Sequence, residues 1–142
     1  MILNKKDALI YLAAPYTHDD PRVVAERMRI IDSYAASMIG AGYRVFSPLS
    51  YGHNLARRYS LATNYEYWAS FNDEILRACQ YLLVLRLPGW QDSKGLAREI
   101  AIAKEREIPI EYLYPDLSDF GVTIEPDTSG LSINQFEVLG AN

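Results

Sequence analysis

Glu99 is the side chain in this sequence whose type and position best suit chemistry. It lies in the segment LAREIAIAKERE, whose strong helix formers predict a helix. At about 100° per residue, Glu99 falls on the same arc as Leu96 and Ala103, whereas Arg98 and Glu105 face solvent. Most helical glutamates are solvated, so a carboxylate within an apolar arc is a candidate nucleophile or base at the floor of a pocket.

The position of Glu99 in its helix predicts its charge state, and the residues just before the helix are candidate neighbours in the site. Glu99 is expected one turn into that helix, near free N–H groups that favour its ionised form. Asp92 and Ser93 come just before the helix. They are candidates for contact with a ligand, and their ordinary alternative use is as helix N-caps.

A second polar group lies on a helix predicted over residues 65–79. An apolar stripe at helical spacing runs through Trp68, Phe71, Ile75 and Cys79. Asn72 lies within the arc of that stripe, so it must find hydrogen-bond partners. Asp73 lies at the edge of the arc, where a solvated aspartate is the ordinary alternative.

Several other chemistries lack the residues they need. The motifs GxGxxG, GxxxxGK[ST], HExxH and CxxC are absent. His18 and His53 do not lie at a recurrent metal-ligand spacing, and Cys79 ends an apolar stripe, which is typical of a core residue. We therefore expect neither a metal nor a cofactor. Arg57 and Arg58 could hold a phosphate, although exposed arginine pairs are common on protein surfaces.

The elements that must position these residues alternate along the chain. Four strands are predicted, over residues 8–14, 43–48, 81–87 and 108–114, with helices over about 21–39, 65–79 and 96–107. Residues 50–64 are predicted to be a loop with room for a short helix. This order predicts a single α/β domain, Rossmann-like or flavodoxin-like, whose parallel sheet of four to five strands has helices on both faces and right-handed crossovers.

Ligands of such sheets bind at the carboxyl ends of the strands, near the switch in strand order. This rule selects three loops, over residues 13–20, 47–54 and 88–95. The first of them carries Ala14 and Tyr16, which we expect to contact the substrate.

Composition and charge restrict the partners. Of the 142 residues, 49% are hydrophobic and 23% are charged, which is typical of a globular chain. A net charge of −4 argues against a nucleic-acid polymer and favours a small ligand. Every apolar run is too short for a membrane span, so no membrane partner is expected. The single cysteine cannot form an internal disulfide, and we expect a cytoplasmic protein.

The charge also divides the chain into a domain and a tail. Residues 1–114 contain every lysine and arginine, whereas residues 115–142 contain five acidic residues and no basic one. We expect residues 1–114 to form the α/β domain and the acidic tail to pack on it or on a neighbouring subunit, with SINQFEVL as a possible edge strand. The aromatic-rich helix and the tail together predict a homo-oligomer, a dimer or a tetramer.

Three segments carry a resemblance to a known family. IYLAAPY at the start, the Asn72-Asp73 pair followed after a strand by DSKGLAREIAIA, and a short final strand resemble the nucleoside 2-deoxyribosyltransferase superfamily over residues 8–112. That superfamily includes transferases that exchange the base of deoxynucleosides and hydrolases of nucleoside 5′-monophosphates. LPGWQDSKG resembles a less characterised bacterial and phage branch. The first loop reads AAPYTHDD where many members have a glycine.

The resemblance implies roles for individual residues. Gly95 and Glu99 match the motif of glycine, three residues and glutamate, in which the glutamate attacks the anomeric carbon. Tyr11 matches the tyrosine that hydrogen-bonds this glutamate, although a core tyrosine is the ordinary alternative. Asp73 matches the aspartate that aids the leaving base or the sugar, and Ser93 matches a hydroxyl that contacts the 5′ group in the monophosphate hydrolases.

The expected function is cleavage of the N-glycosidic bond of a nucleoside or nucleotide. Hydrolysis is slightly favoured over transfer, because Ser93 and the two arginines suit a 5′-phosphate. An alternative is a nucleotide-binding or sensing domain that keeps the pocket without turnover. A third alternative is a structural subunit of a phage or mobile-element assembly.

Overall fold

A parallel sheet is the centre of the computed structural model, which describes residues 5–115. Within these residues the sheet has four strands in the order β2-β1-β3-β4. All adjacent strands are parallel, as predicted. The strands are β1 (Leu9–Ala13), β2 (Arg44–Phe46), β3 (Tyr81–Leu85) and β4 (Ile110–Leu113). The acidic tail from residue 116 onward, with SINQFEVL, lies outside the described residues.

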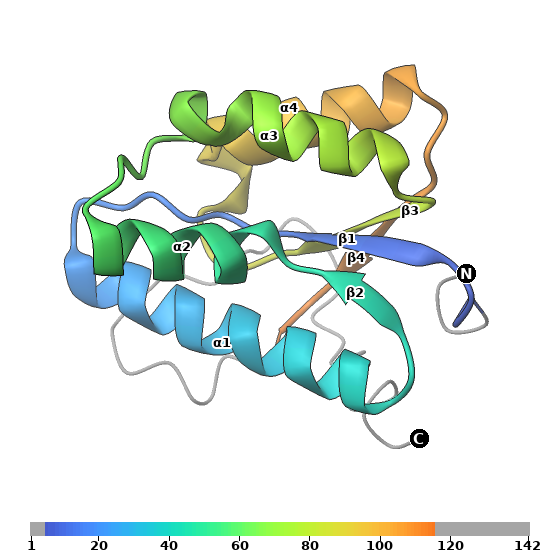
Figure 1. Ribbon diagram of the computed structural model, residues 1–142, viewed down its shortest axis with the longest axis horizontal. Coiled ribbons are helices and arrows are strands. Elements are labelled where there is room, and N and C mark those ends of the chain that lie inside the picture. The colour runs from blue at the N-terminus through green and yellow to red at the C-terminus, as the bar shows by residue number, and fades with distance from the viewer. Residues whose placement is uncertain (1–4, 116–142) are drawn as a thin grey trace.

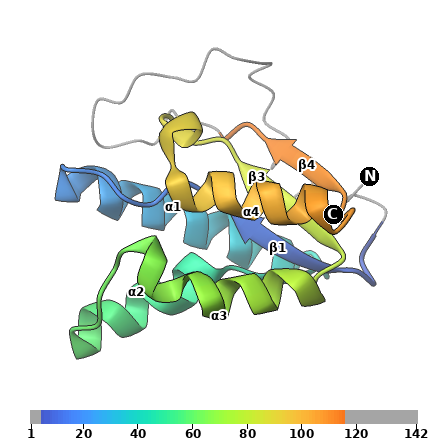
Figure 2. The same cartoon turned by 90° about the horizontal axis from the view of Figure 1, so that it is seen from above.

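Helices cover both faces of the sheet (Figure 1). Helix α1 lies on one face, and α3 and α4 lie side by side on the other (Figures 1 and 2). The helices are α1 (Pro21–Gly40), α2 (Pro48–Tyr59), α3 (Tyr65–Ala78) and α4 (Lys94–Glu105), with a short 3-10 turn, η2 (Trp90–Asp92). The fold class predicted from the sequence is confirmed: a Rossmann-like α/β domain.

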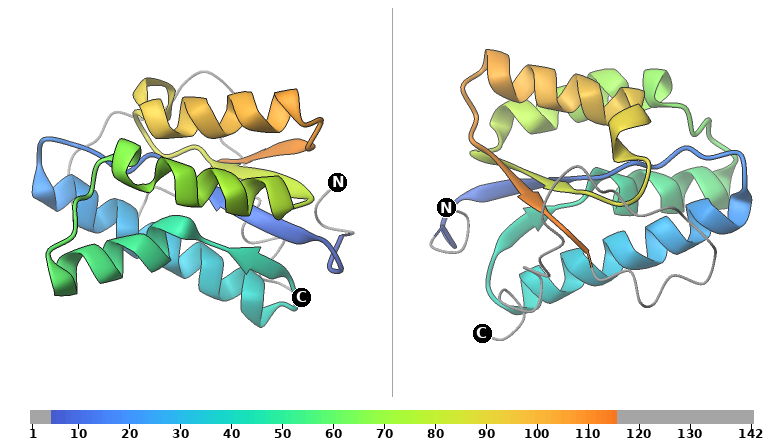
Figure 3. Two further views of the ribbon diagram at one scale, coloured as in Figure 1. Left: turned by 45° about the horizontal axis from the view of Figure 1, so that its top comes forward. Right: turned by 180° about the vertical axis from the view of Figure 1, so that it is seen from behind.

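The strand order creates a switch point between β1 and β3. From β1 the chain passes to β2 at one edge of the sheet and then returns across β1 to β3 (Figure 3). The segments that leave β1 and β3 therefore diverge at their carboxyl ends, where ligands of open α/β sheets bind.

Strand β1 divides its residues between the two faces. Ile10 and Leu12 face α1 and join an apolar core with residues of that helix. Tyr11 and Ala13 face α3 and α4 and join a second core. This alternation follows from the two-residue period of a strand, and it places the Tyr11 ring on the same side of the sheet as α4.

The largest difference from the sequence prediction is α2. Residues 50–64 were expected to be mainly loop, yet a full helix begins at Pro48. The Ser47 side chain caps its first turn, and proline fits the first helical position because it lacks an N–H. The helix ends at Ser60, whose left-handed backbone (φ 58°) stops it.

The buried face of α3 also differs from the prediction. Phe71 was expected in a buried stripe but is 43% exposed. The buried residues of α3 are instead Asp73 and Leu76. The reason is that the aromatic rings pack toward α2: Phe71 stacks on Tyr51, and the Trp68 ring lies against Gly52. The prediction that Cys79 is a core residue is confirmed.

Candidate active site

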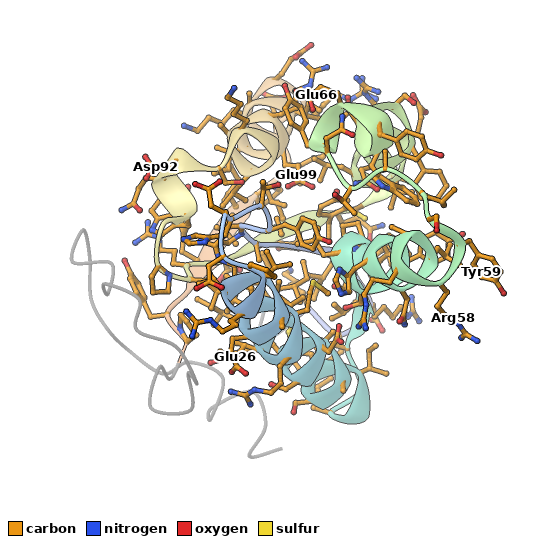
Figure 4. All side chains as sticks on the ribbon, turned by 90° about the vertical axis from the view of Figure 1, so that its left-hand side faces the viewer. Glu26, Arg58, Tyr59, Glu66, Asp92 and Glu99 are labelled. Carbon is orange, nitrogen blue, oxygen red and sulfur yellow. The ribbon has the colours of Figure 1, made fainter. Side chains whose placement is uncertain are left out.

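A cavity of about 480 Å³ opens at the carboxyl ends of β1 and β3. Residues from all three predicted ligand loops line it, together with the first turns of α3 and α4 and one face of α2. Figure 4 looks onto this end of the molecule and shows Glu99 near its centre, whereas Glu26, Arg58 and Tyr59 lie at the periphery. The order of the strands in the sheet thus brings these three loops, which are far apart in the sequence, to one site.

Glu99 lines this cavity, and Tyr11 contacts Glu99 from the interior of the protein. Tyr11 is fully buried, and its hydroxyl donates a hydrogen bond to Glu99 Oε2. Glu99 lies on the inward face of α4 in line with Leu96 and Ala103, as its position in the apolar arc predicted. The contact joins residues that are 88 positions apart, so it is a product of the fold.

Burial determines the charge state of Glu99. Desolvation raises the pKa of its carboxyl from 4.5 to about 7, the Tyr11 hydrogen bond lowers it, and the nearby Asp73 carboxylate raises it. Any effect of the helix N–H groups, which were expected to favour the ionised form, is outweighed by burial, since the pKa is raised; Glu99 lies beyond the first turn, and Ser93 already caps the Leu96 N–H. At neutral pH this carboxyl can therefore both give and take a proton.

Tyr11 remains a proton donor in this environment. Burial raises the pKa of its phenol far above the ordinary value, and the adjacent Glu99 carboxylate raises it further. The hydroxyl therefore keeps its proton and orients one carboxylate oxygen of Glu99. The other oxygen does not share this hydrogen bond.

Asp73 is buried rather than solvated, which corrects the prediction that it lies at the edge of the helix face. Its Oδ2 accepts from Arg98 Nη2 at 3.2 Å. Arg98 was expected in solvent; 54% of its side chain is exposed, but its guanidinium reaches across from α4 to α3. Both residues line the cavity with Glu99, and Glu66, Asp92 and Lys94 line it as well.

The predicted substrate-contact residues all line the cavity: Ala14, Tyr16, Asn72, Asp92, Ser93 and Gly95. Their local roles differ. Ser93 is the N-cap of α4, since its Oγ accepts the Leu96 N–H at 3.2 Å. Gly95 allows α4 to approach α3, because an added Cβ would lie 3.3 Å from Tyr65 Cβ. Asp92 is exposed at the rim (Figure 4).

The arginine pair lies outside the lining of the cavity. Arg57 and Arg58 are both exposed in the last turn of α2, and Arg58 points away from the site (Figure 4). Burial and then the charge of Arg57 lower the pKa of the His53 imidazole, whereas burial raises the pKa of the Tyr16 phenol and Arg57 opposes that rise.

Sequence reasoning missed the wall that α2 contributes. His53 lines the cavity, and its Nδ1 lies 2.6 Å from the Tyr16 hydroxyl. Trp68 and Gly52 line the cavity beside it. The signal was present in the Ser47-Pro48 helix start and in the spacing of residues 49, 52, 53 and 56, which fall on one helix face.

Arg27 was also missed, and it joins two of the loops. It is 3% exposed; its Nη1 donates to the Thr17 carbonyl at 3.0 Å and its Nη2 to the Pro88 carbonyl at 2.8 Å. Gly89 follows with φ 85°, and an added Cβ there would lie 3.0 Å from Arg27 Nη2. This guanidinium therefore fixes the loop after β1 against the loop after β3.

The described residues contain neither a metal-binding cluster nor a membrane-spanning helix. Across residues 5–115, no group of three or more His, Cys, Asp or Glu side chains could hold a metal ion. None of the helices in this part of the chain is long and apolar enough to cross a membrane.

Comparison with known families gave one match. The family model described as "Domain of unknown function (DUF1937)" matches residues 8–114. No curated protein matched the chain. The matched region contains all four described strands, Tyr11, and every residue that lines the cavity, from Ala13 to Glu99.

Proposed function

The chain belongs to the DUF1937 family, whose description states no activity, and we propose that it cleaves the N-glycosidic bond of a nucleoside or nucleoside 5′-monophosphate. Glu99 is the proposed nucleophile. Hydrolysis is slightly favoured over transfer of the sugar to another base.

The observation that carries this proposal is the Tyr11–Glu99 pair. A desolvated carboxyl, oriented by a buried hydroxyl, faces a cavity at the switch point of the sheet. Strongly shifted carboxyl groups in such cavities are typical of catalytic sites. A purely structural glutamate would gain little from a position where burial disfavours its charge.

The reaction follows the retaining logic of glycosidases. The free oxygen of Glu99 attacks the anomeric carbon, and the C–N bond breaks with its electron pair leaving on the base. The base takes a proton from Asp73 or from water. Water then attacks the same carbon, the C–O bond to Glu99 breaks and frees its carboxylate, and the proton that water loses returns to Asp73 or passes to solvent. Tyr11 orients the nucleophile, and the mechanism calls on no cofactor.

The other cavity walls suit a nucleoside. The rings of Tyr65 and Trp68 offer aromatic surface on which a base can stack. The volume of about 480 Å³ lies within the range of small-molecule sites, roughly 300–1,000 Å³. Ser93 remains the proposed contact for a 5′-phosphate.

The proposed assembly is a homo-oligomer, a dimer or a tetramer. Aromatic side chains on α2 and α3 are exposed, among them Tyr51, Tyr67 and Phe71, and a second copy would cover them. Light scattering at tens of micromolar tests this, and a monomer contradicts it. We also propose a cytoplasmic location, because the single cysteine, Cys79, is buried and unpaired.

A substrate panel tests the activity. The protein is incubated with nucleosides and their 5′-monophosphates, with and without an acceptor base, and free base is measured by chromatography. Base release without an acceptor supports hydrolysis, and release only with an acceptor supports transfer. Thermal stabilisation without release would favour a nucleotide-binding domain instead, and neither effect would contradict both functions.

A further inference from the structure

The wall of the cavity contributed by α2 holds a hydrogen-bonded pair that the proposed reaction does not use. Tyr16, in the loop after β1, and His53, on α2, both line the cavity. Their rings meet edge to face, and the Tyr16 hydroxyl lies 2.6 Å from His53 Nδ1. Glu99 comes from α4, a different wall of the same cavity (Figure 4).

The surroundings of the pair determine where its protons lie. Burial, and then the Arg57 charge, lower the pKa of the His53 imidazole below 6.5, and the opposing effect of Asp32 is smaller. Burial raises the pKa of the Tyr16 phenol. At neutral pH the imidazole is therefore neutral and the phenol is protonated. Either partner can then be the donor, and in the tautomer in which Tyr16 donates to Nδ1 the imidazole proton lies on Nε2.

This arrangement leaves a hydrogen-bond donor at a cavity wall. Within residues 5–115, the side-chain hydrogen bond of His53 is the one at Nδ1, and Nε2 has no protein partner. Arg57 follows His53 by four residues on α2, so both lie on one side of the helix. No Asp or Glu occurs in α2 that could compete for these donors.

We propose that the Tyr16–His53 pair determines substrate specificity: Tyr16 locks the imidazole tautomer, and His53 Nε2–H binds a hydrogen-bond acceptor of the substrate away from the bond that Glu99 cleaves. This inference deepens the proposed function and rests on it. The acceptor is either a phosphate oxygen or a nitrogen or carbonyl oxygen of the base. Tyr16 is then a positioning residue, and His53 is a binding residue.

If His53 only ties the loop after β1 to α2, it needs Nδ1 and not Nε2. Substitution of His53 by Gln or by Asn therefore separates substrate binding from this structural role. His53→Gln places an amide nitrogen near the position of Nε2 and keeps a donor there. His53→Asn places its amide near Nδ1 and cannot reach as far as Nε2. Substrate binding through Nε2 therefore predicts that Gln is tolerated better than Asn, and a structural tie predicts the reverse.

The experiment measures kcat and KM for base release by wild type, His53→Gln, His53→Asn and Tyr16→Phe on the panel of nucleosides and monophosphates. We expect His53→Asn to raise KM by about tenfold or more, as for a lost hydrogen bond, with kcat nearly unchanged. His53→Gln should remain within about threefold of wild type, and Tyr16→Phe should lie between the two. His18→Asn is the matched control, because His18 is exposed and outside the cavity lining.

The substrate panel identifies the acceptor. Weakening of the monophosphates alone assigns it to a phosphate oxygen, and equal weakening of the nucleosides assigns it to the base. Equal KM values for His53→Gln and His53→Asn, or a better Asn variant, overturn this inference and leave the proposed function intact. If no substrate releases base, the rise in melting temperature that each monophosphate causes is measured in place of KM. If no monophosphate raises the melting temperature of wild type, both proposals are overturned.

Discussion

The two faces of β1 show how one strand serves two purposes. Ile10 and Leu12 face an apolar core beneath α1, whereas Tyr11 faces Glu99 and the neighbourhood of Asp73. Both faces are closely covered by helices, so the difference lies in what is buried. Apolar side chains stabilise both faces, whereas on the second face the buried Glu99 carboxyl opposes this stabilisation.

In this fold, stability and chemistry are separated between the two faces of one strand. Neighbouring residues of β1 point to opposite faces, so a substitution on the α1 face should mainly reduce the free energy of unfolding, whereas a substitution at Tyr11 should mainly reduce turnover. Arg27 is the exception on α1: it is buried, but it bonds to the cavity loops at Thr17 and Pro88. Three predictions test this separation, in order of decreasing expected effect.

Leu12→Ala should give the largest change in folding stability. Leu12 is fully buried on the α1 face, and truncation of a buried leucine costs about 2–5 kcal/mol in the free energy of unfolding. Base release per folded molecule should stay at the wild-type level. Denaturant unfolding and a turnover assay on the same samples check this. A loss of turnover without a loss of stability would mean that the two faces are not separate.

Glu99→Gln should stabilise the protein in a pH-dependent manner. The carboxyl has its ordinary pKa of 4.5 when unfolded and a raised value of about 7 when folded. Below pH 4.5 Glu99 is neutral in both states and carries no penalty. Between pH 4.5 and 7 the unfolded state is already ionised while the folded state keeps its proton, so wild type progressively loses stability relative to the variant, and the loss is complete once the folded state ionises above pH 7.

This shift in pKa corresponds to about 3 kcal/mol at pH 8. Melting temperatures of wild type and Glu99→Gln at pH 5 and pH 8 measure it. Glu105→Gln, on the exposed side of α4, is the matched control and should show no such trend. A variant that melts below wild type at pH 8 would indicate that Glu99 helps the fold.

Ser93 should show the smallest effect, and two variants separate its roles. Ser93→Ala removes the cap of α4 and should cost about 1 kcal/mol of stability. Ser93→Asp keeps a good cap but places a negative charge at the cavity. If Ser93 contacts a 5′-phosphate, Ser93→Asp should weaken monophosphates at least tenfold more than the matching nucleosides. Equal kinetics on both substrates would leave Ser93 as a cap alone.

The sequence predicted those parts of the site that follow from the periodicity of a single strand or helix. The helical arc of α4 was sufficient to orient Glu99, whereas the pairing of Tyr11 with Glu99 was expected only from the family resemblance. The position of Asp73 was not predictable from one helix, because the aromatic side chains of α3 pack on α2 and rotate its buried face. The Asp73–Arg98 ion pair likewise depends on how α3 and α4 pack.

Other parts of the site were missed for two different reasons. The helix start at Ser47-Pro48 was readable, but the polar residues that follow suggested a loop, so residues 47–54 were selected as a ligand loop without His53 being assigned to a helix face or named as a site residue. Arg27 offered no local signal, since an arginine in a helical pattern is ordinarily solvated. Its role depends on carbonyls that lie 10 and 61 positions away.

The most direct test of the central claim is base release by Glu99→Gln. The variant keeps the size and the hydrogen-bonding capacity of the side chain but cannot form the glycosyl-enzyme, so kcat should fall by several orders of magnitude while the protein remains folded. Glu105→Gln, measured alongside, should retain wild-type kcat. Unchanged base release by Glu99→Gln would contradict the assignment of Glu99 as the nucleophile.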